Sequence, residues 1–148
     1  MAEAVHVVCP HCDATNRVPR DKPAAAGKCG ACGARLFEGH PLPLDEARFD
    51  KHAAASGIPL LVDFWASWCG PCRMMAPVFE EAAARLEPHF RLVKIDTEAA
   101  PRLAARFAIR SIPSLVLLRR GTEIARSAGA MPLAQLLAWA QQHAAAGG

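Results

Sequence analysis

The sequence lacks any apolar run long enough to cross a membrane, although 52% of its 148 residues are hydrophobic. A membrane-spanning helix needs about 20 consecutive apolar residues, and proline, glycine or a charged residue interrupts every apolar run well before that length. The first twelve residues also lack the basic patch and apolar segment that mark a secretory signal peptide. These absences predict a cytoplasmic protein without membrane contact, in a compartment where permanent disulfides are uncommon.

An excess of charge is absent as well. The chain has 17 Lys and Arg against 14 Asp and Glu, which gives a formal net charge of +3. Nucleic-acid-binding domains gather basic side chains on one surface, and this balance argues against such a partner. The glycine patterns G-x-G-x-x-G and G-x-x-x-x-G-K-[ST] are missing too, so we expect no directly bound nucleotide.

All six cysteines, by contrast, occur in Cys-x-x-Cys pairs, and two of the pairs lie near the N-terminus. Cys9, Cys12, Cys29 and Cys32 follow the spacing C-x2-C-x16-C-x2-C, which is typical of zinc sites. Zn²⁺ binds four thiolates tetrahedrally, and a segment of about 40 residues buries too little apolar surface to fold without a metal or cross-link. We therefore predict a zinc ribbon over residues 1–38 that holds one structural Zn²⁺ through these four cysteines.

Within that ribbon, the alternating segments 5–8 and 35–37 are predicted to form short strands. His6, His11 and His40 are interpreted as surface residues rather than ligands, because four cysteines complete the site. Two alternatives remain open from the spacing alone: two structural disulfides, or a second redox-active pair.

Residues 39–44 contain two prolines and a glycine and are predicted to link the ribbon to a second domain over residues 45–148. In that domain, helix-like and strand-like segments alternate. The expected helices are 45–56, 69–86, 101–107 and one from 132 onward, and the expected strands are 60–65, 90–95, 114–118 and 122–127. This order predicts an α/β fold with a central mixed sheet flanked by helices, to which residues 42–44 add a candidate edge strand.

The third cysteine pair follows a predicted buried strand and opens a predicted helix, a context that favours redox chemistry over metal binding. Helical spacing places Cys72 on the apolar stripe, whereas Cys69 precedes the first turn, so we expect Cys69 to be exposed and Cys72 buried. The unpaired N–H groups at a helix N-terminus favour a thiolate. We therefore predict that Cys69 is the attacking nucleophile and Cys72 the resolving thiol.

Asp63 interrupts the apolar run of strand 60–65, where an ionised carboxylate is costly unless it is paired or kept neutral. We interpret Asp63 as the proton acceptor for Cys72, with Lys94 on the next strand as its partner. A purely structural buried ion pair between Asp63 and Lys94 is the alternative.

Aromatic and sulfur-containing residues surround the third pair. Trp68 stands beside Cys69 and is interpreted as part of a surface that docks protein substrates. Trp65, Met74 and Met75 are interpreted as core residues, since methionines on an amphipathic helix usually pack inside.

Two stretches of the chain closely resemble the active-site region of the thioredoxin family. They are Leu61-Val62-Asp63-Phe64-Trp65-Ala66 and Trp68-Cys69-Gly70-Pro71-Cys72. The resemblance covers about residues 45–148 and includes Pro77, the stretch Ile109-Arg110-Ser111-Ile112-Pro113-Ser114, Gly121 and Gly129. Together with the four-cysteine segment, the whole chain is similar to the zinc-ribbon-bearing thioredoxin 2 type.

This resemblance implies a thioredoxin fold and a protein-disulfide reductase that is recycled by an NADPH-dependent thioredoxin reductase. It also implies that Pro113 is a cis-proline that aligns the substrate against the cysteine pair. The implied docking surface consists of Trp68, Gly70, Pro71, Ile112, Pro113, Gly129 and Ala130. Arg73, Ser111 and Ser114 depart from the residues common at these positions, which concerns substrate preference rather than the chemistry.

Three further expectations complete the prediction. The protein is expected to act as a monomer on protein disulfides. A zinc-ribbon binding module for nucleic acid or protein, with an accessory thioredoxin domain, is the alternative function, and an oxidase or isomerase on the same scaffold is a further rival. The ribbon itself has two possible roles, a docking surface or an oxidation sensor, and the sequence does not separate them.

Overall fold

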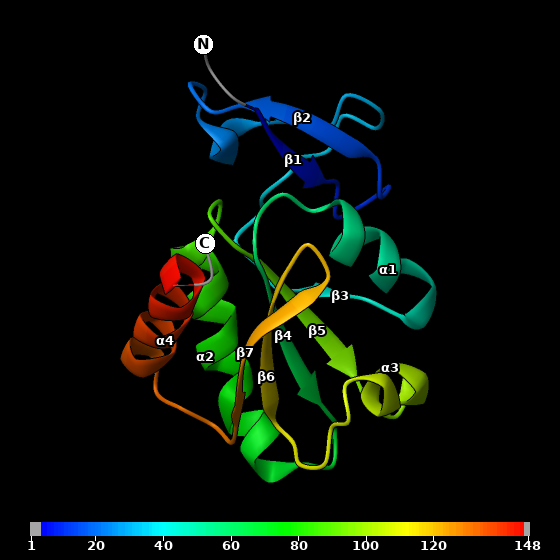
Figure 1. Ribbon diagram of the computed structural model, residues 1–148, viewed down its shortest axis with the longest axis vertical. Helices are drawn as coiled ribbons and strands as arrows, with labels where there is room; N and C mark the ends of the chain where they lie inside the picture. The colour runs from blue at the N-terminus through cyan, green and yellow to red at the C-terminus, as the bar shows by residue number, and fades with distance from the viewer. Residues whose placement is uncertain (1–3, 147–148) are drawn as a thin grey trace.

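The computed structural model describes residues 4–146 and contains a small sheet near the N-terminus and a larger sheet in the remainder of the chain (Figure 1). The small sheet consists of β1 (Ala4–Val8) and β2 (Thr15–Pro19), which pair antiparallel. A short 3₁₀ helix, η1 (Ala24–Ala26), follows. We call residues 4–38 the ribbon segment.

The strand predicted at residues 35–37 is wrong. Arg35 forms only an isolated bridge with Lys28, and the partner of β1 is β2 instead. The first cysteine knuckle joins β1 directly to β2, so a hairpin between them closes a shorter loop than pairing with residues 35–37 would. Leu36 and Phe37 are buried in the small core of the ribbon segment rather than in a ladder.

The larger sheet has five strands in the order β3-β5-β4-β6-β7. Their bounds are β3 Leu42–Pro43, β4 Leu60–Trp65, β5 Arg91–Asp96, β6 Ser114–Arg119 and β7 Thr122–Ala128. β5 is parallel to β3 and β4, whereas β6 is antiparallel to β4 and β7. The predicted mixed sheet is confirmed, and the edge strand β3 lies inside the segment predicted as a linker.

Two helices cover each face of this sheet (Figure 1). α1 (Glu46–Ala55) and α3 (Pro101–Arg106) pack on one face, and α2 (Gly70–Leu86) and α4 (Leu133–Ala146) pack on the other. Asp45 caps α1 as its side chain accepts a hydrogen bond from the Arg48 amide. No helix within residues 4–146 is long and apolar enough to span a membrane.

The alternation of side chains along β4 determines which face of the sheet Asp63 points to. Leu60, Val62 and Phe64 pack toward α1 and α3, whereas Leu61 packs toward α2 and α4. Because alternate residues of a strand point to opposite faces, Asp63 shares the Leu61 face. The carboxyl group of Asp63 is therefore directed to the side that α2 covers.

The ribbon segment packs against the end of the larger sheet at which β4 and β5 begin, whereas α2 begins at the opposite end (Figure 1). Arg91, the first residue of β5, donates hydrogen bonds to the carbonyl oxygens of Val8 and Leu36, at 3.3 and 2.7 Å. The amide of Gly57 donates to the carbonyl oxygen of His6 at 2.8 Å. A Cβ atom at Gly57 would lie 2.9 Å from the His6 nitrogen, so this close approach requires glycine.

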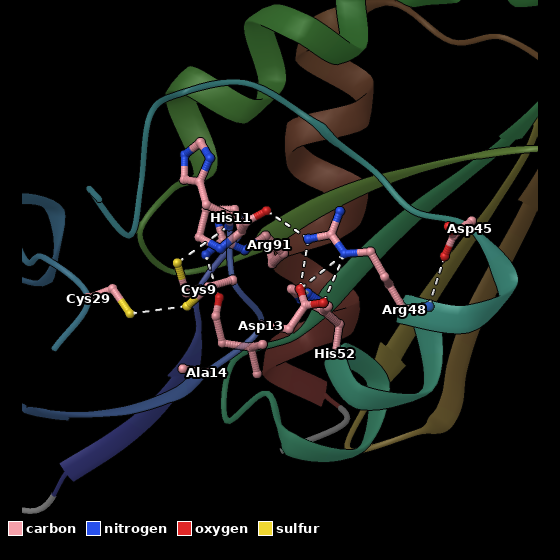
Figure 2. A network of polar contacts seen from close by, with 12 residues as sticks. Cys9, His11, Asp13, Ala14, Cys29, Asp45, Arg48, His52 and Arg91 are labelled. Carbon is pink, nitrogen blue, oxygen red and sulfur yellow. Dashed lines mark hydrogen bonds and ion pairs between the residues drawn. The ribbon is translucent and has the colours of Figure 1, made fainter. Parts of the chain in front are cut away.

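A second group of polar contacts joins the first cysteine knuckle to α1 (Figure 2). The Asp13 carboxylate accepts hydrogen bonds from Arg48 Nη2 at 2.7 Å and lies 2.8 Å from His52 Nε2. These hydrogen bonds lower the pKa of Asp13 to about 2, with Arg48 as the largest cause. Burial lowers the pKa of His52, which is 1% exposed. The ribbon segment is thus held on the rest of the chain by buried and partly buried polar contacts.

Candidate functional site

Cys69 and Cys72 form a disulfide at the beginning of α2, with their Cα atoms 5.2 Å apart. Cys69 is the N-cap residue of the helix, and its Sγ accepts a hydrogen bond from the Cys72 amide at 3.1 Å. Pro71 lies in the first turn, where a missing N–H costs no helical hydrogen bond. Once the disulfide is reduced, the same amide and the helix dipole favour a thiolate at Cys69.

The exposed position predicted for Cys69 is wrong for this oxidised form. Cys69 is only 5% exposed, against 3% for Cys72. The sulfur of Cys69 turns over the helix N-terminus to bond with Cys72, and Ala66 and Ile112 pack around the pair. Cys72 lies on the buried side of α2, as the helical spacing predicts.

A loop with a cis peptide bond between Ile112 and Pro113 adjoins the disulfide. The Sγ of Cys69 lies 3.6 Å from the carbonyl oxygen of Ile112. The Gly129 amide donates to the Pro113 carbonyl at 2.8 Å, and Gly129 has φ +95, a conformation that favours glycine. The beginning of β6 and the end of β7 thus meet beside the cysteine pair.

Two large apolar side chains near the disulfide are exposed, Trp68 by 65% and Met74 by 74%. The interpretation of Met74 as a core residue is wrong, because Met75 occupies the buried stripe of α2 and Met74 lies one residue off it. Trp68 Nε1 donates to Glu98 Oε1 at 2.5 Å. Sequence reasoning missed Glu98, although the parallel pairing of β4 and β5 brings the segments after both strands to one edge.

Asp63 is 1% exposed, and neither of its carboxylate oxygens has a hydrogen-bond partner among the described residues. Burial raises the pKa of Asp63 to about 6, although the charge of Lys94 acts in the opposite direction. Lys94 lies beside Asp63 in the β4–β5 pairing, but its Nζ sits over the Trp65 ring, 4.7 Å from the centroid. Within residues 4–146, no ion pair joins the two side chains, so the alternative of a structural buried ion pair is not supported.

The four N-terminal cysteines come together as one cluster. Their sulfur atoms all lie within 4.8 Å of one another, and the distances Cys9–Cys32 and Cys12–Cys29 are both 3.6 Å. A tetrahedral zinc ion with Zn–S bonds of about 2.3 Å spaces its sulfurs about 3.8 Å apart, so the donor set fits zinc. All four are free thiols, which argues against the alternative of two structural disulfides.

Donors from the knuckles point at two of these sulfurs. The His11 amide donates to Cys9 Sγ and the Ala31 amide to Cys29 Sγ, both at 3.4 Å. Asn16 Nδ2 also donates to Cys29 Sγ at 3.5 Å, and this hydrogen bond is the largest cause that lowers the Cys29 pKa to about 6. Asn16 was not recognised from the sequence, because a lone asparagine on a short strand carries no metal-site signal.

The histidines near the cluster contact carboxylates. His11 pairs with Glu38, and His40 pairs with Glu80, whose hydrogen bond and negative charge raise the His40 pKa. The metal-ligating group found within residues 4–146 contains only the four cysteines. The interpretation of these histidines as residues outside the site agrees with this arrangement.

The location of the Cys69–Cys72 disulfide in the fold defines the class of protein. A dithiol at the start of a helix, next to an open backbone loop, can exchange its bond with a disulfide of another protein. A mixed sheet flanked by helices with such a pair is characteristic of thiol–disulfide oxidoreductases, and this chain is one of them.

Comparison with known proteins identifies the family. Residues 40–142 match the family model described as Thioredoxin, and residues 8–34 match the model described as Thioredoxin 2, N-terminal, a zinc ribbon. The chain belongs to the thioredoxin family, whose members are protein-disulfide reductases. The ribbon match and the four-cysteine cluster together indicate zinc binding.

Curated relatives agree with this assignment. The chain is 46% identical over 136 residues to Thioredoxin C-3 of Corynebacterium nephridii, which covers 92% of this chain and 93% of that protein. It is 40% identical over 102 residues to Thioredoxin of Haemophilus influenzae, covering 69% of this chain and 95% of the relative. The match to Thioredoxin 1 of a Nostoc species is 40% over 98 residues, with 66% and 92% covered.

Proposed function

We propose that the protein reduces disulfides of other proteins by dithiol–disulfide exchange through Cys69 and Cys72. The Cys69 thiolate attacks one sulfur of the substrate disulfide, and the other substrate sulfur leaves as a thiolate that takes up a proton. The thiolate of Cys72 then attacks Cys69 Sγ, which breaks the mixed disulfide and releases the second substrate thiol. Two electrons pass to the substrate, and the Cys69–Cys72 disulfide remains.

The placement of Cys69 at the N-cap of α2, where the Cys72 amide points at its sulfur, is the observation that carries this proposal. An NADPH-dependent thioredoxin reductase returns the disulfide to the dithiol. Catalytic reduction of insulin by the protein, with NADPH and thioredoxin reductase present, tests the proposal. Failure to turn insulin over would contradict it.

The substrate-docking surface surrounds this pair. We propose that Trp68, Gly70, Pro71, Ile112, Pro113, Gly129 and Ala130 form it, with Pro113 aligning an extended substrate segment. The carbonyl oxygen of Ile112 lies 3.6 Å from Cys69 Sγ. An extended substrate segment beside Ile112 would bring the substrate sulfur to Cys69, which supports this role. The exposed Met74 extends the apolar area on the side of α2.

We propose that Asp63 accepts the proton of Cys72 when Cys72 attacks the mixed disulfide. Lys94 is proposed as its partner, whose positive charge lowers the Asp63 pKa. A carboxyl group with a pKa of about 6 can be ionised at neutral pH and still bind a proton readily. Its position on the face covered by α2 supports the assignment, since Cys72 belongs to the buried side of that helix.

Asp63→Asn is expected to stabilise the oxidised protein at pH 7 by about 3 kcal/mol, an upper estimate from a pKa raised from 3.8 to about 6. A raised folded-state pKa means that the native state binds the proton more tightly, so stability falls as pH rises from about 4 to about 6. Above pH 6 the wild type is destabilised by the full cost of the buried Asp63 carboxylate. Below pH 4 the variant and the wild type should be equally stable. Urea unfolding from pH 4 to pH 8 measures the difference.

The matched control for this prediction is Asp21→Asn, an exposed aspartate of the ribbon segment. It should give no comparable pH-dependent difference. An Asp63→Asn difference that stays constant from pH 4 to pH 8 would contradict the buried-acid interpretation.

We propose that the four N-terminal cysteines bind one structural Zn²⁺ as thiolates. Zinc supplies the cross-link that a segment of this size needs, because its apolar cluster is small. We also propose that residues 1–38 form the ribbon domain, 39–44 the linker and 45–148 the thioredoxin domain. We further propose that the protein is a monomer and works in the cytoplasm, where cysteines stay reduced and can bind zinc.

Cys29→Ser is expected to lower the zinc content from about one ion per chain to below about 0.2, because one thiolate of four and the hydrogen bond from Asn16 are lost. Release of zinc into a chromogenic chelator after denaturation measures the content. Cys72→Ser serves as the control and should retain about one ion. Equal zinc content in both variants would overturn the assignment.

A further inference from the structure

One basic side chain of α2 lies beside the cysteine pair. Arg73 is in the first turns of α2, and its amide donates to the Cys69 carbonyl oxygen at 3.1 Å. This contact places Arg73 one helical turn after Cys69, and residues four apart lie on the same face of a helix. The Arg73 side chain is exposed. It therefore belongs to the part of α2 that a partner of Cys69 can reach.

The guanidinium of Arg73 points back toward the start of α2. Side chains on a helix lean toward its N-terminus, and Arg73 Nη1 donates to the Ser67 carbonyl oxygen at 3.1 Å. Ser67 immediately precedes Trp68, which is largely exposed. The cation thus lies next to the segment that carries Trp68 and Cys69, at the edge of the proposed substrate-docking surface.

Most donors of this guanidinium are free for a ligand. An arginine carries five N–H donors in a planar fork that matches a carboxylate. The Ser67 carbonyl takes one of them, and within residues 4–146 no carboxylate forms an ion pair with Arg73. Other surface arginines do have such partners, as Arg85 has in Glu81 and Arg126 has in Glu123.

The acidic groups near Trp68 are already hydrogen-bonded. Glu98 Oε1 accepts a hydrogen bond from the Trp68 indole at 2.5 Å, and Asp96 Oδ1 accepts one from the Glu98 amide at 2.9 Å. Both residues belong to the end of β5 and the segment after it, not to α2. Neither carboxylate therefore neutralises Arg73 by direct contact.

The stretches that contain the docking surface are residues 66–75, 109–114 and 129–131. Their only charged residues are Arg73 and Arg110, and they contain no Asp or Glu. Arg110 is exposed as well and has no ion pair within the described part of the chain. Unpaired cations at a binding surface favour a partner that brings negative charge.

We propose that Arg73 selects protein substrates that carry an Asp or Glu beside the disulfide to be reduced. This inference rests on the proposed function and narrows its substrate class. The substrate carboxylate pairs with the guanidinium while the substrate sulfur approaches Cys69 Sγ. Arginine can donate two parallel hydrogen bonds to one carboxylate, so it also fixes the direction of approach. Arg73 itself takes no part in the exchange of sulfur bonds.

Three disulfide-linked peptide dimers provide the test. Each half is acetyl-Gly-X-Cys-X-Gly-amide, where X is glutamate, glutamine or lysine, so the two sulfurs of a dimer are equivalent. Reduced, zinc-loaded full-length protein is mixed with excess peptide, and the reaction is stopped with acid. Mass spectrometry then measures how fast the Cys69–Cys72 disulfide forms. No thioredoxin reductase is present, so its own contacts with the protein do not affect the rates.

Arg73→Gln should slow reduction of the glutamate peptide at least about threefold, which is the size of one exposed ion pair, and change the glutamine-peptide rate less than about 1.5-fold. Arg73→Glu should reverse the preference, so that the lysine peptide reacts faster than the glutamate peptide. Because exposed charges are screened by salt, about 0.5 M NaCl should remove most of the difference between wild type and Arg73→Gln.

The matched control is Lys51→Gln, which removes the same charge from an exposed position on α1, a helix on the other face of the sheet. It should leave the glutamate preference unchanged within about 1.5-fold. An equal loss of preference in Lys51→Gln and Arg73→Gln would indicate only a general charge effect and would overturn the proposal.

Two further outcomes decide the matter. Equal slowing of all three peptides by Arg73→Gln would overturn the proposal, because a disturbed Trp68 segment affects every substrate alike. Wild-type protein that reduces all three peptides without any dependence on their charge would contradict the role of Arg73 and leave the proposed function intact. Wild-type protein that reduces none of them would contradict both.

Discussion

Cys69→Ser is expected to reduce the rate of insulin reduction at least about a thousandfold, because a hydroxyl group at this position cannot replace a thiolate as the attacking group. The N-cap position and the Cys72 amide favour a sulfur anion at neutral pH. A serine hydroxyl is not ionised there, so the first bond to the substrate does not form. The rate is measured as NADPH consumption with thioredoxin reductase and insulin.

Cys72→Ser is the control that separates the two sulfur roles. This variant keeps the attacking thiolate but lacks the resolving thiol, so it should form a stable mixed disulfide with a substrate that mass spectrometry detects. Cys69→Ser should form no such adduct under the same conditions. An adduct that forms through Cys72 as readily as through Cys69 would reverse the assignment of nucleophile and resolving thiol.

The burial of Cys69 in the disulfide form affects how this chemistry begins. Only 5% of Cys69 is exposed, yet Trp68 and Met74, close to the cysteine pair in sequence, are largely exposed. We infer that a partner that reduces the disulfide contacts these two side chains and the Ile112 backbone, and that these contacts orient the incoming thiol toward Cys69.

Local patterns predicted the thioredoxin domain well. The continuous apolar run of β4 and the capping residue Asp45 are signals carried by neighbouring residues, and both elements formed where expected. The ribbon segment was harder, because the pairing of β1 depends on which of two short segments closes the smaller loop. Both 15–19 and 35–37 are candidates, and the shorter loop favours 15–19, which pairs with β1.

In the site, the sequence identified residues whose chemistry is unusual for their surroundings. A carboxylate in an apolar strand and paired cysteines are such signals, and they point to Asp63 and to both cysteine sites. Glu98 and Asn16 have no unusual setting in sequence, because they act through long-range hydrogen bonds, Glu98 with Trp68 and Asn16 with Cys29 and the Gly30 amide. Met74 was placed in the core because methionines on an amphipathic helix usually pack inside, but it lies one residue off the buried stripe that contains Met75.

Long-range contacts also decide how the ribbon segment is attached. Arg91 Nη1 lies 3.1 Å from Glu87 Oε2, and the two side chains are each only 4% exposed. Arg91 also donates to two backbone carbonyls of the ribbon segment and lies over the Phe37 ring, 4.6 Å from its centroid. Burial raises the pKa of Glu87, an effect that the Arg91 charge opposes. One buried guanidinium thus satisfies groups from both domains.

Arg91→Ala is expected to lower the free energy of unfolding by about 3 to 5 kcal/mol, because it leaves the buried Glu87 carboxylate without its charged partner. The Val8 and Leu36 carbonyls also lose their donor, and the packing over Phe37 is lost. Urea unfolding of the zinc-loaded protein measures the change. The loss should be larger at pH 8 than at pH 5, where an unpaired Glu87 can take up a proton.

Arg85→Ala is the matched control, because Arg85 forms an ion pair with Glu81 at the same sequence separation but on the surface. The Arg85 and Glu81 side chains are 59% and 54% exposed, and loss of such a pair costs less than about 1 kcal/mol. The double variant Glu87→Leu, Arg91→Met removes both buried charges and should recover part of the stability. If Arg91→Ala cost no more than Arg85→Ala, the ribbon segment would be held by its apolar contacts, and the buried guanidinium would be dispensable.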